Sequence, residues 1–218
     1  MNNYSFLKEK DISIDQQIKF NKQYQHLSKV ELDLFQKYKK DNIRLVVPDL
    51  KYFNLYLKEI NNQFVDDYVL DEQLKKETEL LLLNKINYLE ELNNKKNQIT
   101  LWLIDNNKFI GRVRLKNLEK DIYDQYFQDK NNLKEGNFGY KIATRYQNLG
   151  YGKIIMSLSF LSFSLLKKSS IFFTIDKTNI PSIKCAQALN CENGNDFIIK
   201  NHHYQIFKKE IFNIENTQ

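Results

Sequence analysis

The sequence YQNLGYGK, residues 146–153, joins a predicted strand at residues 137–143 to a predicted helix at residues 154–166. Hydrophobic residues alternate along the strand, and the helix is apolar nearly all round, which predicts that it is buried. Glycine allows the backbone to approach a ligand closely, and the first amides of a helix point outward with a partial positive charge. A strand, a glycine-containing turn and a buried helix in this order are therefore suited to binding a phosphate group.

The two glycines of this turn, Gly150 and Gly152, fit neither of two common phosphate-binding patterns. A P-loop needs a glycine five residues before its Gly-Lys pair and a hydroxyl after it, but these positions hold Gln147 and Ile154. A dinucleotide-binding fingerprint needs a small residue three positions after the second glycine, where Ile155 stands. ATP and NAD are therefore not favoured, and a helix start that merely contains glycine is the alternative to phosphate binding.

Glycine is scarce in the rest of the chain. The 218 residues include six glycines and two prolines, where average usage would give roughly 15 and 11. Four of the six glycines lie between Gly136 and Gly152. This composition excludes collagen-like, Gly/Ser-linker and Pro-rich disordered classes. With 42% hydrophobic residues, a chain of this length can bury a core, so a soluble globular protein is predicted.

Charge and cysteine usage narrow the class further. The formal net charge is +6, but lysines and acidic residues are mixed along nearly the whole chain, so no nucleic-acid partner is expected. Cys185 and Cys191 match no zinc or redox spacing, which predicts reduced structural thiols and no metal. The first residues lack an apolar run and the longest apolar stretch, 154–166, is too short to span a bilayer. A cytoplasmic protein with no membrane partner is expected.

The chain before the turn divides into a helical arm and a mixed region. Hydrophobic spacings of three and four from about Ile12 to Lys40 predict one or two amphipathic helices. The further elements expected, in chain order, are a strand at 43–47, a helix begun by Pro48 and Asp49, a helix at 71–92, a hairpin of strands 99–104 and 109–115, and a loop at 118–135. After the buried helix we expect a central strand at 171–175, a helix from Asn179 to about Asn190, and strands near 197–200 and 204–208.

The turn and its neighbours resemble a known family. Gln147-Asn148-Leu149-Gly150-Tyr151-Gly152 is similar to the Gln/Arg-x-x-Gly-x-Gly/Ala signature of the GNAT acetyltransferase superfamily, and the chain looks closest to a bacterial branch of predicted acetyltransferases. Phe138-Gly139-Tyr140-Lys141-Ile142 resembles the fourth strand of that family, and 176–182 its strand-to-helix stretch. Trp102-Leu103-Ile104-Asp105, with Phe109-Ile110-Gly111, resembles the hairpin before its long loop.

The resemblance implies an α/β fold with a twisted mixed sheet flanked by helices, in which two strands splay apart around acetyl-CoA. The GNAT domain is expected at residues 43–218 and the helical N-terminal extension at residues 1–42. The family's cofactor contacts transfer to Gln147, Asn148, Leu149, Gly150, Tyr151, Gly152 and Lys153 at the pyrophosphate, to Tyr140, Lys141 and Ile142 along the pantetheine arm, and to Asn179 across the cleft. A side chain added at Gly152 is expected to lie where the pyrophosphate binds.

The implied activity is transfer of an acetyl group from acetyl-CoA, as co-substrate, to a primary amine of a small molecule or a protein by direct attack on the thioester. A backbone amide near Ile142 would polarise the thioester carbonyl. Many members place a tyrosine acid seven residues after the motif Asn, where this chain has Ala186. The alternative is therefore a coenzyme-A-binding regulatory or interaction module without turnover.

Asp176, at the end of the central strand, is the candidate catalytic base, and a cap for the helix at Asn179 is its alternative role. Glu135 and Glu192 are lesser candidates. His26, His202 and His203 have no recognisable partner in the sequence and are predicted to be non-catalytic. The apolar stripe of the arm is expected to pack on the domain, and covering the acceptor cleft or forming a homodimer contact is the alternative.

Overall fold

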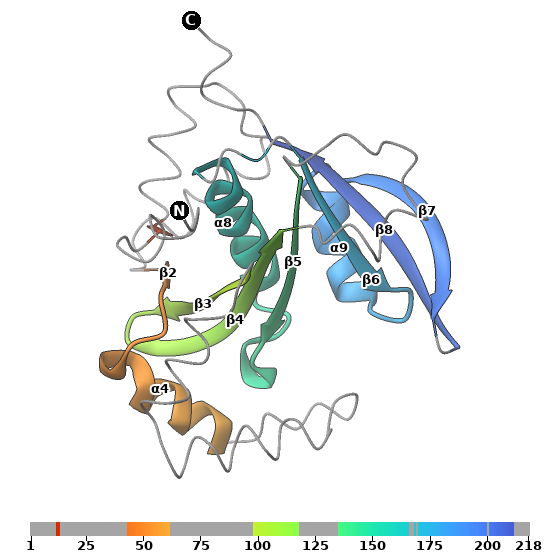
Figure 1. Ribbon diagram of the computed structural model, residues 1–218. Helices are drawn as coiled ribbons and strands as arrows, with labels where there is room; N and C mark the ends of the chain where they lie inside the picture. Colours follow the sequence, from red (N-terminus) through yellow and green to blue (C-terminus); the bar gives the residue numbers. More distant parts are fainter. Residues whose placement is uncertain are drawn as a thin grey trace, which may run out of the picture.

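The computed structural model describes residues 12–13, 43–61, 98–117, 135–165, 168, 170–199 and 201–211. Their strands form one mixed sheet of eight strands in the order β1-β2-β3-β4-β5-β6-β8-β7 (Figure 1). The elements, in chain order, are β1 (Ile12–Ser13), β2 (Arg44–Val46), α4 (Leu50–Asn61), β3 (Gln98–Asp105), β4 (Lys108–Asn117), β5 (Glu135–Ile142), the 3₁₀ turn η1 (Thr144–Tyr146), α8 (Tyr151–Leu165), β6 (Ser170–Asp176), α9 (Ile180–Ala188), β7 (Glu192–Ile199) and β8 (His202–Glu210). The predicted α/β sheet flanked by helices is confirmed.

The β3–β4 hairpin forms where the sequence predicted it. Asn106 and Asn107 both adopt a left-handed backbone, with φ of 43° and 62°. Two consecutive left-handed residues make the tight turn whose twist matches that of paired strands, and asparagine tolerates this conformation well. Along β4, Val113 is buried and Arg112 and Arg114 are partly exposed, so the side chains alternate between the two faces of the sheet.

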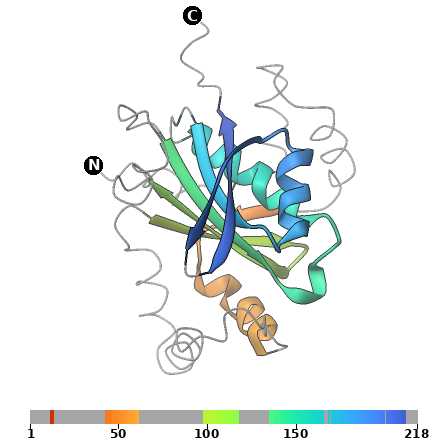
Figure 2. The ribbon, with the colours of Figure 1, turned by 90° about the vertical axis from the view of Figure 1, so that its right-hand side faces the viewer.

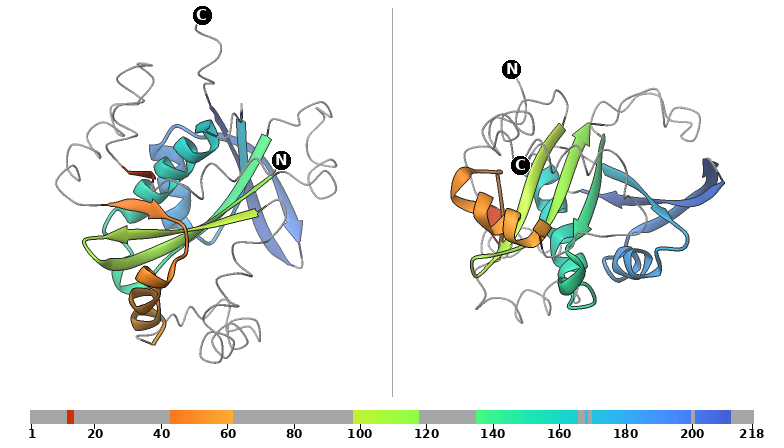
Figure 3. Two further views of the ribbon diagram at one scale, coloured as in Figure 1. Left: turned by 60° about the vertical axis from the view of Figure 1, so that its left-hand side comes forward. Right: turned by 90° about the horizontal axis from the view of Figure 1, so that it is seen from below.

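Helices α8 and α4 lie on opposite faces of this hairpin (Figure 3). A hydrophobic cluster packs on each face. On one face, α8 packs against a large core that includes Leu101, Leu103 and Val113. On the other face, α4 packs on Trp102 and Phe109, and the ring of Tyr56 stacks on Trp102 with centroids 4.6 Å apart. We call these the α8 face and the α4 face of the sheet.

The sheet opens between β5 and β6. These parallel strands pair at three positions only, Glu135 with Ser170, Gly136 with Ile171 and Asn137 with Phe172. Beyond these pairs the strands separate toward their carboxyl ends, and β6 continues instead with β8 on its other side (Figure 1). Figure 2 shows the β7–β8 hairpin at the sheet edge nearest the viewer. The splayed pair of strands implied by the resemblance is therefore present.

Some predictions lie outside the described residues, and others need correction. The predicted helix at 71–92 and nearly all of the arm 1–42 are outside. The predicted loop at 118–135 is outside except for Glu135, which begins β5 instead. Ile12 and Ser13, where a helix was expected to start, pair with β2 as a short strand instead. β7 begins at Glu192, five residues before the predicted start, because an edge strand with exposed side chains needs no apolar pattern. The domain boundaries 1–42 and 43–218 stay predictions.

None of the helices in the described residues is long and apolar enough to cross a membrane.

Candidate functional site

The glycine-containing turn connects the open end of β5 to the first turn of α8. Two of its residues have left-handed backbones, Asn148 with φ of 60° and Gly150 with φ of 91°. The Lys153 amide donates to the Gly150 carbonyl oxygen at 3.1 Å, which closes the first turn of the helix. The amides that begin a helix have no acceptor within it, so this turn presents backbone N–H groups at the wide end of the β5–β6 opening.

Two side chains of the turn hold it in place. The Gln147 side-chain amide donates to the Ile142 carbonyl oxygen at 3.2 Å, which fastens the turn to the end of β5. The Tyr151 hydroxyl donates to the carboxylate of Asp105, a buried residue at the end of β3. The start of α8 is therefore fixed to both the strand before it and the hairpin. Asp105 was missed by the sequence analysis, because its partner lies 46 positions away.

Gly152 lies where the start of α8 contacts α9. A Cβ built on it would lie 3.0 Å from Cys185 Sγ and 3.5 Å from the Tyr140 hydroxyl oxygen. A Cβ at this position would therefore enter the contact between α8 and α9. Gly152 lets the two helices approach closely, and its expected place at the pyrophosphate stays a prediction.

The backbone groups near the end of β5 point alternately toward β4 and toward the opening between β5 and β6. The Ala143 amide donates to the Ile110 carbonyl oxygen at 2.9 Å, and hydrogen-bonded pairs alternate along an antiparallel ladder. The backbone groups of Lys141 therefore face β4, and those of Tyr140 and Ile142 face the opening toward β6. A Cβ at Gly111 of β4 would lie 2.3 Å from the Lys141 carbonyl oxygen, which agrees with this assignment. Of the three predicted strand contacts, two thus offer their backbone to the opening.

The start of α9 forms the opposite wall of the opening. The Asn179 side-chain oxygen accepts from the Ser182 amide at 3.2 Å and caps the helix. Asp176, for which the cap was the predicted alternative role, is bonded to Thr178 before the helix begins. From β5, the Tyr140 hydroxyl donates to Ser182 Oγ at 3.0 Å and bridges the two walls. Burial raises the pKa of the Tyr140 hydroxyl far above its ordinary value, so this donor stays protonated. Ala186, at the position where many GNAT members have tyrosine, is fully buried.

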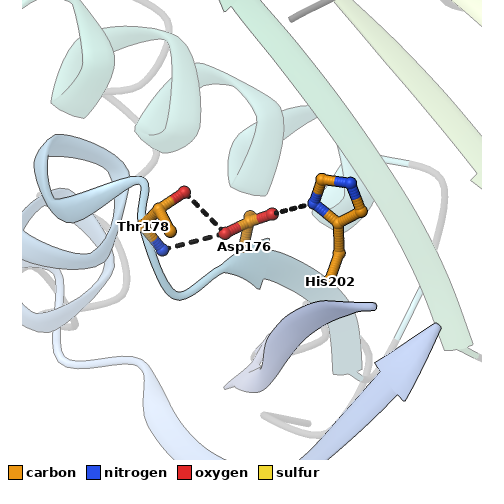
Figure 4. Close-up of polar contacts among 3 residues, drawn as sticks. All are labelled: Asp176, Thr178 and His202. Carbon is orange, nitrogen blue, oxygen red and sulfur yellow. Dashed lines mark hydrogen bonds and ion pairs between the residues drawn. The ribbon is translucent and has the colours of Figure 1, made fainter. Parts of the chain in front are cut away.

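Asp176 lies at the end of β6 and makes three polar contacts (Figure 4). Its Oδ1 accepts from the Thr178 amide at 2.8 Å and from the Thr178 hydroxyl at 2.7 Å. Its Oδ2 lies 3.1 Å from Nδ1 of His202. The two Thr178 hydrogen bonds, followed by the contact with His202, lower the pKa of the Asp176 carboxyl. A carboxylate stabilised in this way is a weak proton acceptor, so Asp176 is a poor catalytic base by itself.

The partner of His202 was not predicted. His202 begins β8, the antiparallel neighbour of β6. This pairing places the His202 imidazole beside Asp176 at the end of β6. A signal was present, since an acidic residue ends a central strand and a histidine begins the last strand, but the pairing of those strands had to be known. Glu192 is exposed at the start of β7, and His26 lies outside the described residues.

A second polar cluster joins α4 to the turn before α8. Arg145 forms an ion pair with the buried carboxylate of Glu59, and its guanidinium lies over the ring of Tyr146, 4.7 Å from the centroid. Burial, partly offset by Arg145, raises the pKa of the Tyr146 hydroxyl. The cluster fixes α4 against the segment that leads into the turn.

In the part of the chain that the structure describes, no three His, Cys, Asp or Glu side chains gather as a metal site requires.

Comparison with solved structures identifies this architecture. The GNAT-family acetyltransferase from Streptococcus pneumoniae is 17% identical with a TM-score of 0.51, and the match covers 79% of this chain and 99% of that one. A spermidine N-acetyltransferase chimera from Vibrio cholerae and hSSAT is 16% identical with a TM-score of 0.52, covering 77% and 95%. The microcin self-immunity acetyltransferase MccE, in complex with acetyl-CoA and AMP, is 15% identical with a TM-score of 0.51, covering 78% and 92%.

No protein-family model matches the chain, and no curated protein matches it. At identities this low, similarity to solved structures establishes the fold and not the activity. The fold is that of the GNAT acetyltransferases, as the turn and its flanking elements led us to expect.

Proposed function

We propose that this protein is an N-acetyltransferase that transfers an acetyl group from acetyl-CoA to a primary amine. The observation that carries the proposal is the V-shaped opening between β5 and β6, with the amides of a helix N-terminus at its wide end. An extended chain with amide groups can add to the unpaired edge of a strand, and a pyrophosphate suits the start of a helix. One of the similar solved structures is a complex with acetyl-CoA, which supports the same ligand here.

The residues around the opening fit the two parts of coenzyme A. The amides from Asn148 to Gly152 would hold the pyrophosphate, since the Lys153 amide already donates to the Gly150 carbonyl oxygen. The Lys153 ammonium would add positive charge. The backbone groups of Tyr140 and Ile142 would bind the pantetheine arm. The side-chain nitrogen of Asn179 would face the pantetheine arm from the start of α9, because the side-chain oxygen of this residue caps the helix.

Bound acetyl-CoA would supply an activated acetyl group as a thioester. The Ile142 amide, which faces the opening, would donate to the carbonyl oxygen as negative charge develops there. Its position is fixed because the carbonyl group of the same residue accepts from Gln147. The amine acceptor would approach from the α4 face of the sheet, since α8 covers the other face. Acceptors to be tested include polyamines, because two of the structural neighbours are spermidine acetyltransferases.

A coenzyme-A-binding module without turnover is the second candidate. It is favoured by Ala186, which is fully buried and provides no hydroxyl where many GNAT members have an acid. The two candidates predict the same cofactor binding and differ in the consumption of acetyl-CoA. Release of free thiol from acetyl-CoA, measured with and without a panel of amines and peptides, separates them. Amine-dependent release supports the enzyme, and binding without release supports the module.

Titration calorimetry with acetyl-CoA tests the binding site directly. We expect the wild-type protein to bind, and Lys153→Glu to weaken binding at least about tenfold, since a charge-assisted contact contributes about 1.5–3 kcal/mol. Lys116→Glu is the matched control, because Lys116 is exposed near the end of β4 that pairs with the start of β5, away from the turn. Absence of binding by the wild type at millimolar ligand, or equal affinities of the two variants, would contradict the proposed site.

A further inference from the structure

The pair formed by His202 and Asp176 has the arrangement of a proton acceptor oriented by a carboxylate. Asp176 is held in one orientation by two hydrogen bonds from Thr178, and its other oxygen lies 3.1 Å from Nδ1 of His202 (Figure 4). A carboxylate only accepts hydrogen bonds, so Nδ1 must carry the ring proton and donate it. The lone pair of neutral imidazole then resides on Nε2, and the His202 side chain is about half exposed, 51% by relative area.

The strand register places this pair at the level of the proposed thioester contact. β5 and β6 pair with a constant offset, from Glu135 with Ser170 to Asn137 with Phe172. Continued along the separating strands, that offset sets Asp176 opposite Lys141, between the levels of Tyr140 and Ile142. Asp176 therefore lies across the opening from the amides that face into it.

The pair also lies on the face from which an acceptor would approach. Ile171, Phe173 and Ile175 of β6 belong to the core beneath α8. Side chains alternate along a strand, so Asp176 projects from the other face, which is the α4 face. Tyr204 is opposite Asp176 in the β6–β8 ladder, and His202, two residues before it on β8, projects from the same face.

We propose that His202 is the general base of the proposed acetyl transfer and that Asp176 is its positioning residue. This inference rests on the proposed function and identifies a group that the sequence analysis rejected. It also accounts for Asp176, whose hydrogen bonds from Thr178 lower the pKa of its carboxyl, so that it stays ionised and accepts the imidazole N–H.

The proton balance of the step is complete with water as the final acceptor. The substrate ammonium loses one proton to Nε2 of His202 and becomes a neutral amine, which forms the C–N bond as the C–S bond of the thioester breaks. The second N–H proton neutralises the departing thiolate. His202 returns its proton to water. The products are an N-acetylated amine, free coenzyme A and one proton in solution.

The charged groups around His202 within the described residues are few. Asp176 faces it from β6, and Lys177 in the following turn is paired with Asp196 of β7. On its own strand, the ring of Tyr204 lies 6.3 Å from the imidazole by centroid distance. The neighbouring His203 projects from the opposite side of the strand. Asp176 is therefore the carboxylate in contact with the ring.

Nitrogen NMR of the imidazole rings tests the orientation of His202 without turnover. Long-range correlations show which ring nitrogen carries the proton, and we expect the Nδ1–H form for His202 at pH 8. Asp176→Asn keeps an oxygen for Thr178 but turns an amide N–H₂ toward Nδ1, so we expect the proton to move to Nε2. His203 in the same spectrum is the internal control. An Nε2–H form in the wild type would overturn the proposal.

Kinetics separate this inference from the proposed function. In an amine acceptor assay at pH 7.5, we expect His202→Gln and Asp176→Asn to lower kcat by about 10²-fold with the Kd for acetyl-CoA unchanged. The loss should shrink as the pH rises toward the pKa of the amine itself, near 10. His203→Gln is the matched control, since both histidines are exposed. A wild-type protein without amine-dependent turnover refutes the proposed function, whereas an active wild type and an equally active His202→Gln refute only the role of His202.

Discussion

At the scale of single residues, Gly152 illustrates how a sequence motif and its physical cause can differ. The motif suggests that glycine stands there to admit a ligand, but the nearest atoms to an added Cβ are Cys185 Sγ and the Tyr140 hydroxyl. The space left by the absent side chain therefore belongs to the contact between α8 and α9. Gly150, with φ of 91°, is the glycine of the turn whose backbone conformation disfavours other residues.

A double-mutant cycle at Gly152 checks this interpretation. Alanine in a helix gains about 0.5–1 kcal/mol over glycine, but overpacking costs about 1–3 kcal/mol. Gly152→Ala should therefore lower the free energy of unfolding by about 1 kcal/mol, a net of these two effects. In a Cys185→Ala background, where the obstructing sulfur is gone, the same change should instead stabilise the fold. Urea unfolding of the four proteins measures the sign change, and equal effects in both backgrounds would contradict it.

At the scale of elements, the backbone amides near the end of β5 alternate in direction, one toward β4 and the next toward the opening. Lys141 faces β4, whereas Tyr140 and Ile142 face the opening. We predict that in the free protein the Lys141 amide exchanges its hydrogen more slowly than the Tyr140 and Ile142 amides. Acetyl-CoA should then slow exchange selectively at Tyr140 and Ile142. Residue-resolved hydrogen exchange by NMR measures this alternation, and uniform protection of all three residues would exclude strand-like binding of the ligand.

The elements also show which parts of the structure local sequence determines. The hairpin, the turn before α8 and the helix that follows Asn179 were predicted because hydrophobic alternation, turn residues and helical spacing act over a few positions. The extent of β7 was missed because the exposed residues from Glu192 to Asp196 carry no apolar pattern. The contact of His202 with Asp176 was missed because it joins residues 26 positions apart through the β6–β8 pairing. Contacts of this kind depend on topology, which a local pattern does not specify.

At the scale of the whole molecule, the sheet consists of two parts that meet over three residue pairs. Strands β1 to β5 form one part and β6, β8 and β7 the other. Gly136 lies in this short junction, and a Cβ there would come within 2.4 Å of the ring of Phe163 on α8. The close approach of α8 to β5 at Gly136 therefore supports the sheet just where the two parts begin to separate. The opening proposed to bind the cofactor depends on this junction.

Two glycines of the same strand provide the test of this dependence. Gly136→Ala should destabilise the protein by about 2 kcal/mol through overpacking against Phe163, and it should weaken acetyl-CoA binding because the walls of the opening shift. Gly139→Ala is the control, since an added Cβ there meets no atom within 4 Å, and it should leave stability unchanged or improve it by about 0.5 kcal/mol. Combining Gly136→Ala with Phe163→Leu should recover part of the loss, because the smaller side chain leaves room for the methyl group. Chemical unfolding and calorimetry measure both effects. If both glycine variants are equally stable and bind equally well, the width of the opening does not depend on the packing of α8 at the junction.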